Sequence, residues 1–293
     1  MYDIIIIGAG PAGMTAALYG ARANKKVLVL EALNYGGEIL NTLNIENYPI
    51  EENISGFDFA TKLYNQITKL GVEVKLEKVI SINRDKEVKT NESTYTGKTI
   101  IIATGLKNRK LDLPLEEELI GKGISYCATC DGAFFKDKDV AVVGGGNTAL
   151  EDALYLSNIC NKVYLIHRRN EFRADPITVD KAFEKDNIKV LYDSIITSIN
   201  GTNNLESIEI NNNELINVEG LFIAIGKVPT LDYLNGIIET NESGYIKSNE
   251  LCHTNIEGIF VAGDIREKSL RQLVTATSDG AVAASEAIKY INK

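Results

Sequence analysis

"DIIIIGAGPAGMTAALYGARANKKVLVLE", residues 3–31, contains a strand, a glycine turn, a helix and a second strand in that order. The stretch "DVAVVGGGNTALEDALYLSNICNKVYLIHRR", residues 139–169, has the same layout. Continuously apolar strands with a helix between them indicate parallel pairing in a sheet that is covered on both faces. The repetition therefore predicts two similar lobes within one α/β chain.

The remaining segments continue this alternation of helices and strands. Residues 57–70 have the periodicity of an amphipathic helix, and the Ala-rich residues 275–292 have it too. We expect short apolar strands that end in glycine at 98–105, 220–226 and 258–264. The whole chain is then of the α/β class.

The composition argues against several classes of protein. The formal net charge of the 293 residues is −9, whereas a nucleic-acid binder needs a basic patch. No apolar run approaches the roughly 20 residues that span a bilayer, and "MYDIIIIGAG" lacks the basic leader of a signal peptide. Four cysteines are too few for a secreted disulfide scaffold. We therefore expect a cytoplasmic protein that binds neither nucleic acid nor membrane.

The first glycine turn predicts a dinucleotide site. It matches GxGxxG directly after a strand, with the residues Gly8, Gly10, Pro11, Ala12 and Gly13. In such loops the glycines allow a tight turn and a close approach of backbone to a pyrophosphate, which meets the helix N-terminus. Glu31 ends the second strand, where a carboxylate accepts hydrogen bonds from a ribose. This acid indicates an adenosine without a 2′-phosphate, as in FAD or NAD.

The second glycine turn differs at the ribose end. Its loop fits GxGxxA with Gly144, Gly146, Asn147, Thr148 and Ala149, but basic residues follow the second strand: His167, Arg168, Arg169 and Arg173. Guanidinium groups bind a 2′-phosphate through charge-assisted, often bidentate hydrogen bonds. The alternative is a solvated basic cluster, which most charge runs are. The location at the end of a nucleotide unit favours NADPH.

The pair Cys127 and Cys130, followed by Asp131, is either half of a metal site, a pair of core thiols or a redox centre. A structural zinc ion needs about four ligands. The chain adds Cys160, Cys252 and two histidines, of which His253 adjoins Cys252 in a poor spacing for shared ligation. The residues therefore argue against a metal site. Cys160, in an Ala/Leu-rich helix, is predicted to be a core residue.

Several motifs together closely resemble the low-molecular-weight thioredoxin reductase family, within the class II pyridine nucleotide-disulfide oxidoreductases. They occur in the family's order and cover nearly the whole chain: "GAGPAG", "YGGEILNT…ENYP" (35–49), "CATCDG", "GGGNTALEDALYLSN", "HRRNEFRA", "FIAIGKVP" and "VAGDIREKSLRQL". The resemblance implies two Rossmann-like, three-layer (ββα/βαβ) domains, with an NADPH domain inserted into a FAD domain. Residues 1–111 plus 234–293 would bind FAD, and residues 112–233 would bind NADPH.

The resemblance also implies the residues around the flavin nucleotide. Besides the first glycine loop and Glu31, they are Gly36, Gly37, Glu38, Asn47, Ala103, Thr104, Gly105, Asp264, Ile265, Arg271 and Gln272. Two positions depart from the family, which usually has glutamine at Glu38 and often has glycine at Ile50. Neither change removes a catalytic group.

By the same resemblance, electrons pass from NADPH through FAD and the Cys127–Cys130 disulfide to thioredoxin, with Asp131 moving a proton. Cys130 would face the flavin and Cys127 would attack thioredoxin. The same cysteine pair has to reach both the flavin and thioredoxin, so proteins of the family rotate one domain relative to the other between the two half-reactions. The crossings near residues 111 and 234 would be the hinge. A homodimer through the FAD domains is implied as well. Three alternatives remain: reduced ferredoxin as the electron donor, a glutaredoxin-like protein as the electron acceptor, and a non-enzymatic flavoprotein whose CxxC binds a metal ion.

Overall fold

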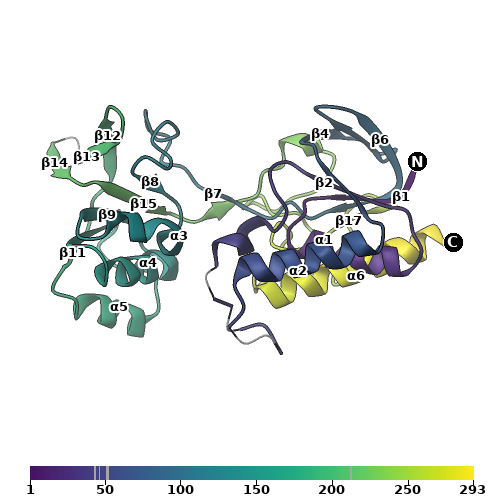
Figure 1. Cartoon of the computed structure of the whole chain (residues 1–293). Helices are drawn as coiled ribbons and strands as arrows, with labels where there is room; N and C mark the ends of the chain where they lie inside the picture. The colour runs from purple at the N-terminus through teal and green to yellow at the C-terminus, as the bar shows by residue number, and fades with distance from the viewer. Residues whose placement is uncertain (43, 46, 51–52, 212) are drawn as a thin grey trace. The chain divides into compact units, whose positions relative to one another are not determined.

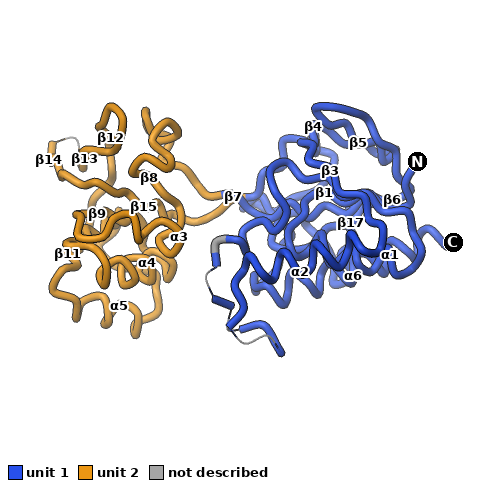
Figure 2. Tube along the Cα trace, in the orientation of Figure 1, with its two compact units in different colours: residues 1–107, 229–293 blue, residues 108–228 orange. Residues whose placement is uncertain are grey.

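The computed structural model describes residues 1–42, 44–45, 47–50, 53–211 and 213–293. Glu46, within the "ENYP" motif, lies outside them. The chain forms two compact units (Figure 2): unit 1 comprises residues 1–107 and 229–293, and unit 2 comprises residues 108–228. One unit is therefore inserted into the sequence of the other, and each has its own sheet and cores.

Unit 1 is built on a sheet with the strand order β3-β2-β1-β6-β5-β4, in which β17 also pairs with β6. The strands β3, β2, β1, β6 and β17 are parallel, whereas β6, β5 and β4 pair antiparallel. Their bounds are β1 Tyr2–Ile7, β2 Val27–Glu31, β3 Glu73–Leu76, β4 Val79–Ile82, β5 Glu87–Thr90, β6 Thr94–Ile102 and β17 Ile259–Val261. The strand expected at 98–105 therefore begins earlier, because its first residues pair with β5.

Helices α1 (Pro11–Arg22), α2 (Gly56–Lys69) and α6 (Leu273–Ile291) lie side by side along unit 1 (Figure 1). A Cβ on Gly280 of α6 would come within 2.2 Å of the Ala12 carbonyl, so glycine permits the close packing of α6 on α1. A capping box of Gln272 and Thr275 starts α6 two residues before the expected 275. Short 3-10 helices η1 (Gly37–Asn41) and η3 (Asp232–Leu234) complete the unit.

Apolar residues fill both faces of the unit 1 sheet, as continuously apolar strands require. Ile4 and Ile6 of β1 belong to the core shared with α1 and α6, whereas Ile5 and Ile7 belong to the core on the other side. This alternation within one strand is the reason that the isoleucine run is buried throughout.

Unit 2 is built on a parallel sheet of order β11-β10-β9-β15-β8 and an antiparallel sheet of order β12-β13-β14. The parallel strands are β8 Ile124–Ser125, β9 Asp139–Gly144, β10 Lys162–Ile166, β11 Ile188–Leu191 and β15 Gly220–Ala224. The antiparallel strands are β12 Ile196–Gly201, β13 Leu205–Ile210 and β14 Glu214–Asn217. Its helices are α3 Ala128–Asp131, η2 Gly132–Phe135, α4 Asn147–Ser157 and α5 Pro176–Phe183.

Both segments that join the units are paired, because β7 (Lys107–Asn108) forms a short ribbon with β16 (Lys227–Val228). The predicted α/β class with two Rossmann-type sheets is confirmed. Among the residues that the structure describes, no helix is long and apolar enough to cross a bilayer.

Candidate functional site

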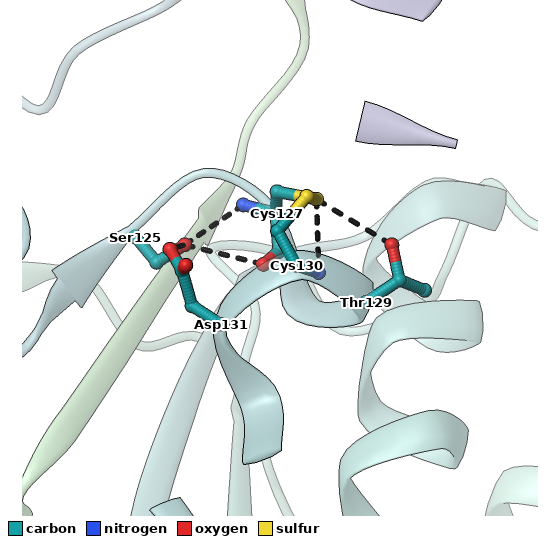
Figure 3. The surroundings of a disulfide bond; sticks show 5 residues. All are labelled: Ser125, Cys127, Thr129, Cys130 and Asp131. Carbon is teal, nitrogen blue, oxygen red and sulfur yellow. Dashed lines mark hydrogen bonds between the residues drawn. A yellow bond between two sulfur atoms is a disulfide. The ribbon is translucent and has the colours of Figure 1, made fainter. Parts of the chain in front are cut away.

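The cysteine pair forms a disulfide at the beginning of α3 (Figure 3). The chain leaves β8 at Ser125, and Cys127 is the N-cap of α3, where its Sγ accepts a hydrogen bond from the Cys130 amide at 3.2 Å. The Thr129 hydroxyl lies 3.4 Å from the same sulfur. Cys127 is half-buried and Cys130 is exposed. The pair therefore lies at the surface of unit 2, where another molecule can contact the disulfide for thiol–disulfide exchange.

Ser125 joins Asp131 to the backbone of Cys127. The Ser125 hydroxyl lies 2.6 Å from Asp131 Oδ2, and it accepts a hydrogen bond from the Cys127 amide at 3.0 Å. This role of Ser125 was not predicted from the sequence. A polar residue at the end of a short buried strand, two positions before the cysteine, was the available signal.

Glu116 is a second residue whose role was not predicted from the sequence. Its carboxylate is buried and accepts hydrogen bonds from the amides of Leu111 and Leu113 at 3.0 and 3.4 Å. The Tyr126 hydroxyl donates to it at 2.6 Å. Burial, together with the Glu116 carboxylate, raises the pKa of Tyr126, so the phenol stays protonated. Glu116 thus fixes the residue that precedes Cys127.

The first glycine loop has the geometry of a nucleotide cradle. Gly8 has a φ of +106°, and a Cβ there would come within 2.4 Å of the Ala103 carbonyl. Gly10 is the N-cap of α1 without a side-chain cap, and a Cβ on it would contact nothing nearer than 3.9 Å. Backbone N–H groups at a helix start with open space before them fit a pyrophosphate.

The Glu31 carboxylate lies next to this loop. Oε2 accepts a hydrogen bond from the Ala9 amide at 2.8 Å, and Oε1 accepts one from the Leu33 amide at 3.0 Å. A carboxylate offers about four lone-pair positions, so each oxygen retains capacity for a ribose hydroxyl. The donor set of this loop therefore fits the adenosine part of a dinucleotide.

Other predicted flavin residues are connected within unit 1. Asn47 donates to Gln272 at 3.1 Å, although the two are far apart in sequence. The Gly36 amide donates to the Ala9 carbonyl at 2.8 Å, which places the Gly36–Gly37 turn against the glycine loop. The Arg271 guanidinium donates to the Asp264 carbonyl at 3.1 Å. Most of the predicted set therefore belongs to one continuous region.

Two further predicted positions, Thr104 and Glu38, and the departing position Ile50 have distinct surroundings. The Thr104 hydroxyl lies 3.0 Å from the Tyr233 hydroxyl. Glu38 is exposed in the first turn of η1. Ile50 is exposed and has a φ of +78°, a region that suits glycine and in which a β-branched residue is an outlier.

The second glycine loop resembles the first. Gly146 is the N-cap of α4 without a side-chain cap, and a Cβ on it would meet nothing within 4 Å. The Arg173 amide donates to the Gly145 carbonyl at 2.7 Å, which brings that arginine to the loop. The side chain of Asn147 hydrogen-bonds to Asp175 in both directions.

The basic residues after β10 divide into two kinds. Arg168, Arg169 and Arg173 are exposed, whereas the His167 ring is buried beneath Gly145 and its Nε2 lies 3.0 Å from the Glu171 carbonyl. Burial lowers the pKa of His167. The exposed arginines fit an anionic group near the loop, and the neutral histidine supports the loop from below.

The other two cysteines are buried thiols. Cys160 packs in the core of unit 2, as predicted, and burial raises its pKa to about 11. Cys252 lies in the core of unit 1, where burial raises its pKa to about 12. Neither thiol is a nucleophile near neutral pH. Within the described ranges given above, no group of three or more His, Cys, Asp and Glu side chains could hold a metal ion.

Comparison with known proteins shows the family to which the chain belongs. Residues 2–280 match the model of the pyridine nucleotide-disulphide oxidoreductase family. The chain is 44% identical to thioredoxin reductase of Listeria monocytogenes, covering 100% of this chain and 95% of that protein. It is 42% identical to thioredoxin reductase of Bacillus subtilis, covering 100% and 96%. The crystal structure of Lactococcus lactis thioredoxin reductase superposes with a TM-score of 0.88 at 40% identity, covering 100% and 99% of the two chains. The chain therefore belongs to the low-molecular-weight thioredoxin reductases of the pyridine nucleotide-disulphide oxidoreductase family.

Proposed function

We propose that this chain is a NADPH-dependent flavoenzyme that passes electrons through FAD and the Cys127–Cys130 pair to the disulfide of thioredoxin. The observation that carries the proposal is the disulfide within CATCD, in a chain with two glycine loops that each end a parallel strand. Full-length relatives that are named thioredoxin reductase support it.

We assign FAD to residues 1–111 plus 234–293, whose boundaries lie close to those of unit 1. The amides at the start of α1 would hold the pyrophosphate, and Glu31 would bind the ribose. The full set is Gly8, Gly10, Pro11, Ala12, Gly13, Glu31, Gly36, Gly37, Glu38, Asn47, Ala103, Thr104, Gly105, Asp264, Ile265, Arg271 and Gln272.

We assign NADPH to residues 112–233, close to the bounds of unit 2. The amides at the start of α4 would hold its pyrophosphate, and the exposed arginines after β10 would bind the 2′-phosphate. The full set is Gly144, Gly146, Asn147, Thr148, Ala149, His167, Arg168, Arg169 and Arg173. These arginines favour NADPH over NADH and over reduced ferredoxin as the electron donor.

Bound NADPH and FAD would supply a hydride and a carrier for its electron pair. The chain itself provides the Cys127–Cys130 disulfide, which takes up two electrons and opens to a dithiol. Cys127 then attacks the partner's disulfide through a mixed disulfide, and Cys130 resolves it. Asp131 exchanges protons with the thiols.

One cysteine pair has to serve the flavin and the partner in turn, so we propose a rotation of one domain relative to the other. The ribbon of β7 and β16 lies where the chain passes between the two units, a few residues before the crossings expected near 111 and 234, and it is the proposed hinge. By resemblance, the working enzyme is a cytoplasmic homodimer that associates through its FAD domains. Sedimentation of the holoenzyme at the mass of a single chain would contradict the dimer.

An anaerobic assay tests the proposed function. We expect NADPH to bleach the flavin absorbance much faster than NADH, and the reduced enzyme to reduce thioredoxin. The variant Cys130→Ser should still be bleached by NADPH but should not turn over thioredoxin, whereas Cys160→Ala should retain turnover. Bleaching without reduction of any thioredoxin would refute the proposed acceptor, and bleaching by NADH at an equal rate would refute the proposed donor.

A further inference from the structure

The Ser125 hydroxyl lies at the centre of the hydrogen bonds next to the disulfide (Figure 3). The residue is 4% exposed at the end of β8. Its Oγ lies 2.6 Å from Asp131 Oδ2, 3.0 Å from the Cys127 amide nitrogen and 3.2 Å from the Cys127 carbonyl oxygen. The hydroxyl therefore has three partners. The Cys127 amide can only donate and the Cys127 carbonyl can only accept, whereas the Asp131 carboxyl group can donate only when it is protonated.

When Asp131 is ionised, its carboxylate accepts the hydrogen bond of the Ser125 hydroxyl. A serine hydroxyl has one hydrogen and two acceptor positions. The Cys127 amide always occupies one acceptor position, because an N–H group can only donate. The Ser125 hydrogen then points to the carboxylate, and this charge-assisted hydrogen bond is stronger than a neutral one.

When Asp131 is protonated, its carboxyl group becomes a donor. Its O–H can point to the second acceptor position of Ser125, and the Ser125 hydrogen can turn to the Cys127 carbonyl. The Cys127 carbonyl also accepts a hydrogen bond from the Asp131 amide at 3.2 Å, and it keeps this bond when the Ser125 hydrogen points to the carboxylate. The three groups around the hydroxyl therefore have partners in both states, and the change requires rotation of hydrogens without movement of a side chain. An unsatisfied buried polar group, which would penalise one of the two states, is avoided.

We propose that Ser125 is a positioning residue for Asp131, because its hydroxyl holds the carboxyl group in the same place in both protonation states during turnover. This inference rests on the proposed function, in which Asp131 exchanges a proton with the cysteine pair. Ser125 acts through Asp131 and the Cys127 backbone.

The proton balance of the reaction needs both states of Asp131. Opening the Cys127–Cys130 bond to two thiols takes up two electrons and two protons. A hydride equivalent from the proposed reductant brings both electrons and one proton, and Asp131 gives the second proton and becomes a carboxylate. In the exchange with a disulfide partner, this carboxylate takes the proton from the attacking thiol and returns it to the partner thiolate that leaves, so the exchange consumes no net proton. Solvent reprotonates Asp131 before the next reduction of the disulfide.

Three variants of the holoenzyme test the proposal. Ser125→Ala removes the hydroxyl, and Ser125→Thr retains one. Ser157→Ala is the matched control, because Ser157 is a buried serine of the same unit whose hydroxyl donates to the Leu154 carbonyl. Turnover is measured with thioredoxin and, separately, with a small aromatic disulfide, and melting curves establish that each variant is folded. Ser125→Gly replaces Ser125→Ala if the latter does not fold.

We expect Ser125→Ala to lower kcat about tenfold with either acceptor, a part of the 10²- to 10⁴-fold effect of a general acid–base group. The KM for thioredoxin and the rate of flavin bleaching by NADPH should change less than about twofold, since the hydroxyl is buried and bonded to Asp131 and the Cys127 backbone. Ser125→Thr should recover most of the activity, and Ser157→Ala should match the unmodified enzyme. A kcat for Ser125→Ala equal to that of Ser157→Ala would overturn the proposal, and so would a Ser125→Thr variant as slow as Ser125→Ala.

A double-mutant cycle adds a separate criterion. In an Asp131→Ala background, removal of the Ser125 hydroxyl should change kcat less than about twofold, because the group that it positions is absent. A further tenfold loss there would show that Ser125 acts independently of Asp131. If the unmodified enzyme reduces the small disulfide but not thioredoxin, the proposed acceptor fails, and the Ser125 comparison is still decided with the small disulfide.

Discussion

The Nζ atom of Lys268 and the Oδ2 atom of Asp279 lie 2.9 Å apart, and both side chains are buried. The same oxygen forms an ion pair with Arg266, whose Nε lies 2.9 Å away, and it accepts a hydrogen bond from the Gly263 amide at 3.1 Å. Asp279 belongs to α6, whereas its partners belong to the segment after β17 that carries Asp264. One carboxylate therefore fixes a segment to which we assign part of the flavin site.

Replacing Asp279 with asparagine should destabilise unit 1 and weaken FAD binding. Two buried cations would then face a neutral amide, and removing one partner of a buried ion pair costs about 3–5 kcal/mol. We expect the free energy of unfolding in urea to fall by about 3 kcal/mol, and the dissociation constant of FAD from the apoprotein, followed by flavin fluorescence, to rise.

The matched control for Asp279 is Glu286→Gln on the same helix. Glu286 pairs with the exposed Lys289 and with His253, and exposed pairs contribute about 0–1 kcal/mol. Equal losses of stability in the two variants would contradict the role of Asp279.

Replacing Glu116 with glutamine should loosen the segment before the disulfide. The buried carboxylate accepts hydrogen bonds from two backbone amides and from Tyr126, and hydrogen bonds to a charged group contribute about 1.5–3 kcal/mol each. We expect a loss of about 2 kcal/mol in unfolding free energy and faster hydrogen exchange at the amides of Leu111 and Leu113. The exposed neighbour Glu117, which pairs with Lys110, supplies the control Glu117→Gln. Unchanged exchange at both amides in Glu116→Gln would refute this role.

Reversing the charge of Arg168 and Arg169 to glutamate should remove the proposed preference for NADPH. Two guanidinium groups would no longer bind the 2′-phosphate, and acidic groups would repel it. We expect kcat/KM to fall about 100-fold for NADPH, equivalent to about 2.7 kcal/mol, and less than about threefold for NADH. Arg84→Glu, at an exposed turn of unit 1, should leave both values unchanged. A parallel loss for NADPH and NADH would show that the arginines do not read the 2′-phosphate.

The stability of unit 2 should fall as the pH rises toward neutrality because of Asp152 on α4. Burial, with a smaller effect of Glu151, raises the pKa of Asp152 to about 7. A folded-state pKa above the unfolded value means that the folded form binds the proton more tightly. The contribution to stability is therefore complete below about pH 4 and is lost as the pH rises to about 7.

The variant Asp152→Asn should abolish this pH dependence. Relative to the unmodified protein, its unfolding free energy should increase by about 2 kcal/mol between pH 5 and pH 8. Asp180→Asn, at an exposed position of α5, provides the control. Parallel stability curves for the unmodified protein and Asp152→Asn would exclude this carboxyl group as the cause.

The fold class could be predicted because its determinants are local. Residues 3–31 and 139–169 each contain the strand, the turn and the helix of one unit, and the period of apolar residues distinguishes strands from helices. The strand expected at 98–105 instead runs from Thr94 to Ile102. Its first part is set by antiparallel pairing with β5, a contact between segments that no single window of sequence contains.

The two glycine loops and the cysteine pair were also visible in the sequence, because glycine spacing and CxxC are short-range patterns with direct chemical meaning. The hydrogen-bond networks that hold these groups in place were not visible in the sequence. Asn47 donates a hydrogen bond to Gln272, Lys268 donates one to Asp279, and Tyr126 donates one to Glu116. The residues of each pair lie in different segments of the chain, so they come into contact only after packing has oriented both side chains.

The groups to which we assign the chemistry could therefore be found in the sequence: two glycine loops of different charge, and a cysteine pair followed by an acid. Which polar groups hold them in place depends on the tertiary structure. It brought the Ser125 hydroxyl between Asp131 and the Cys127 backbone and gathered buried cations around Asp279. The physical reason is that composition and spacing specify which groups are present, whereas hydrogen bonds of about 3 Å need the folded backbone to fix the position of both partners.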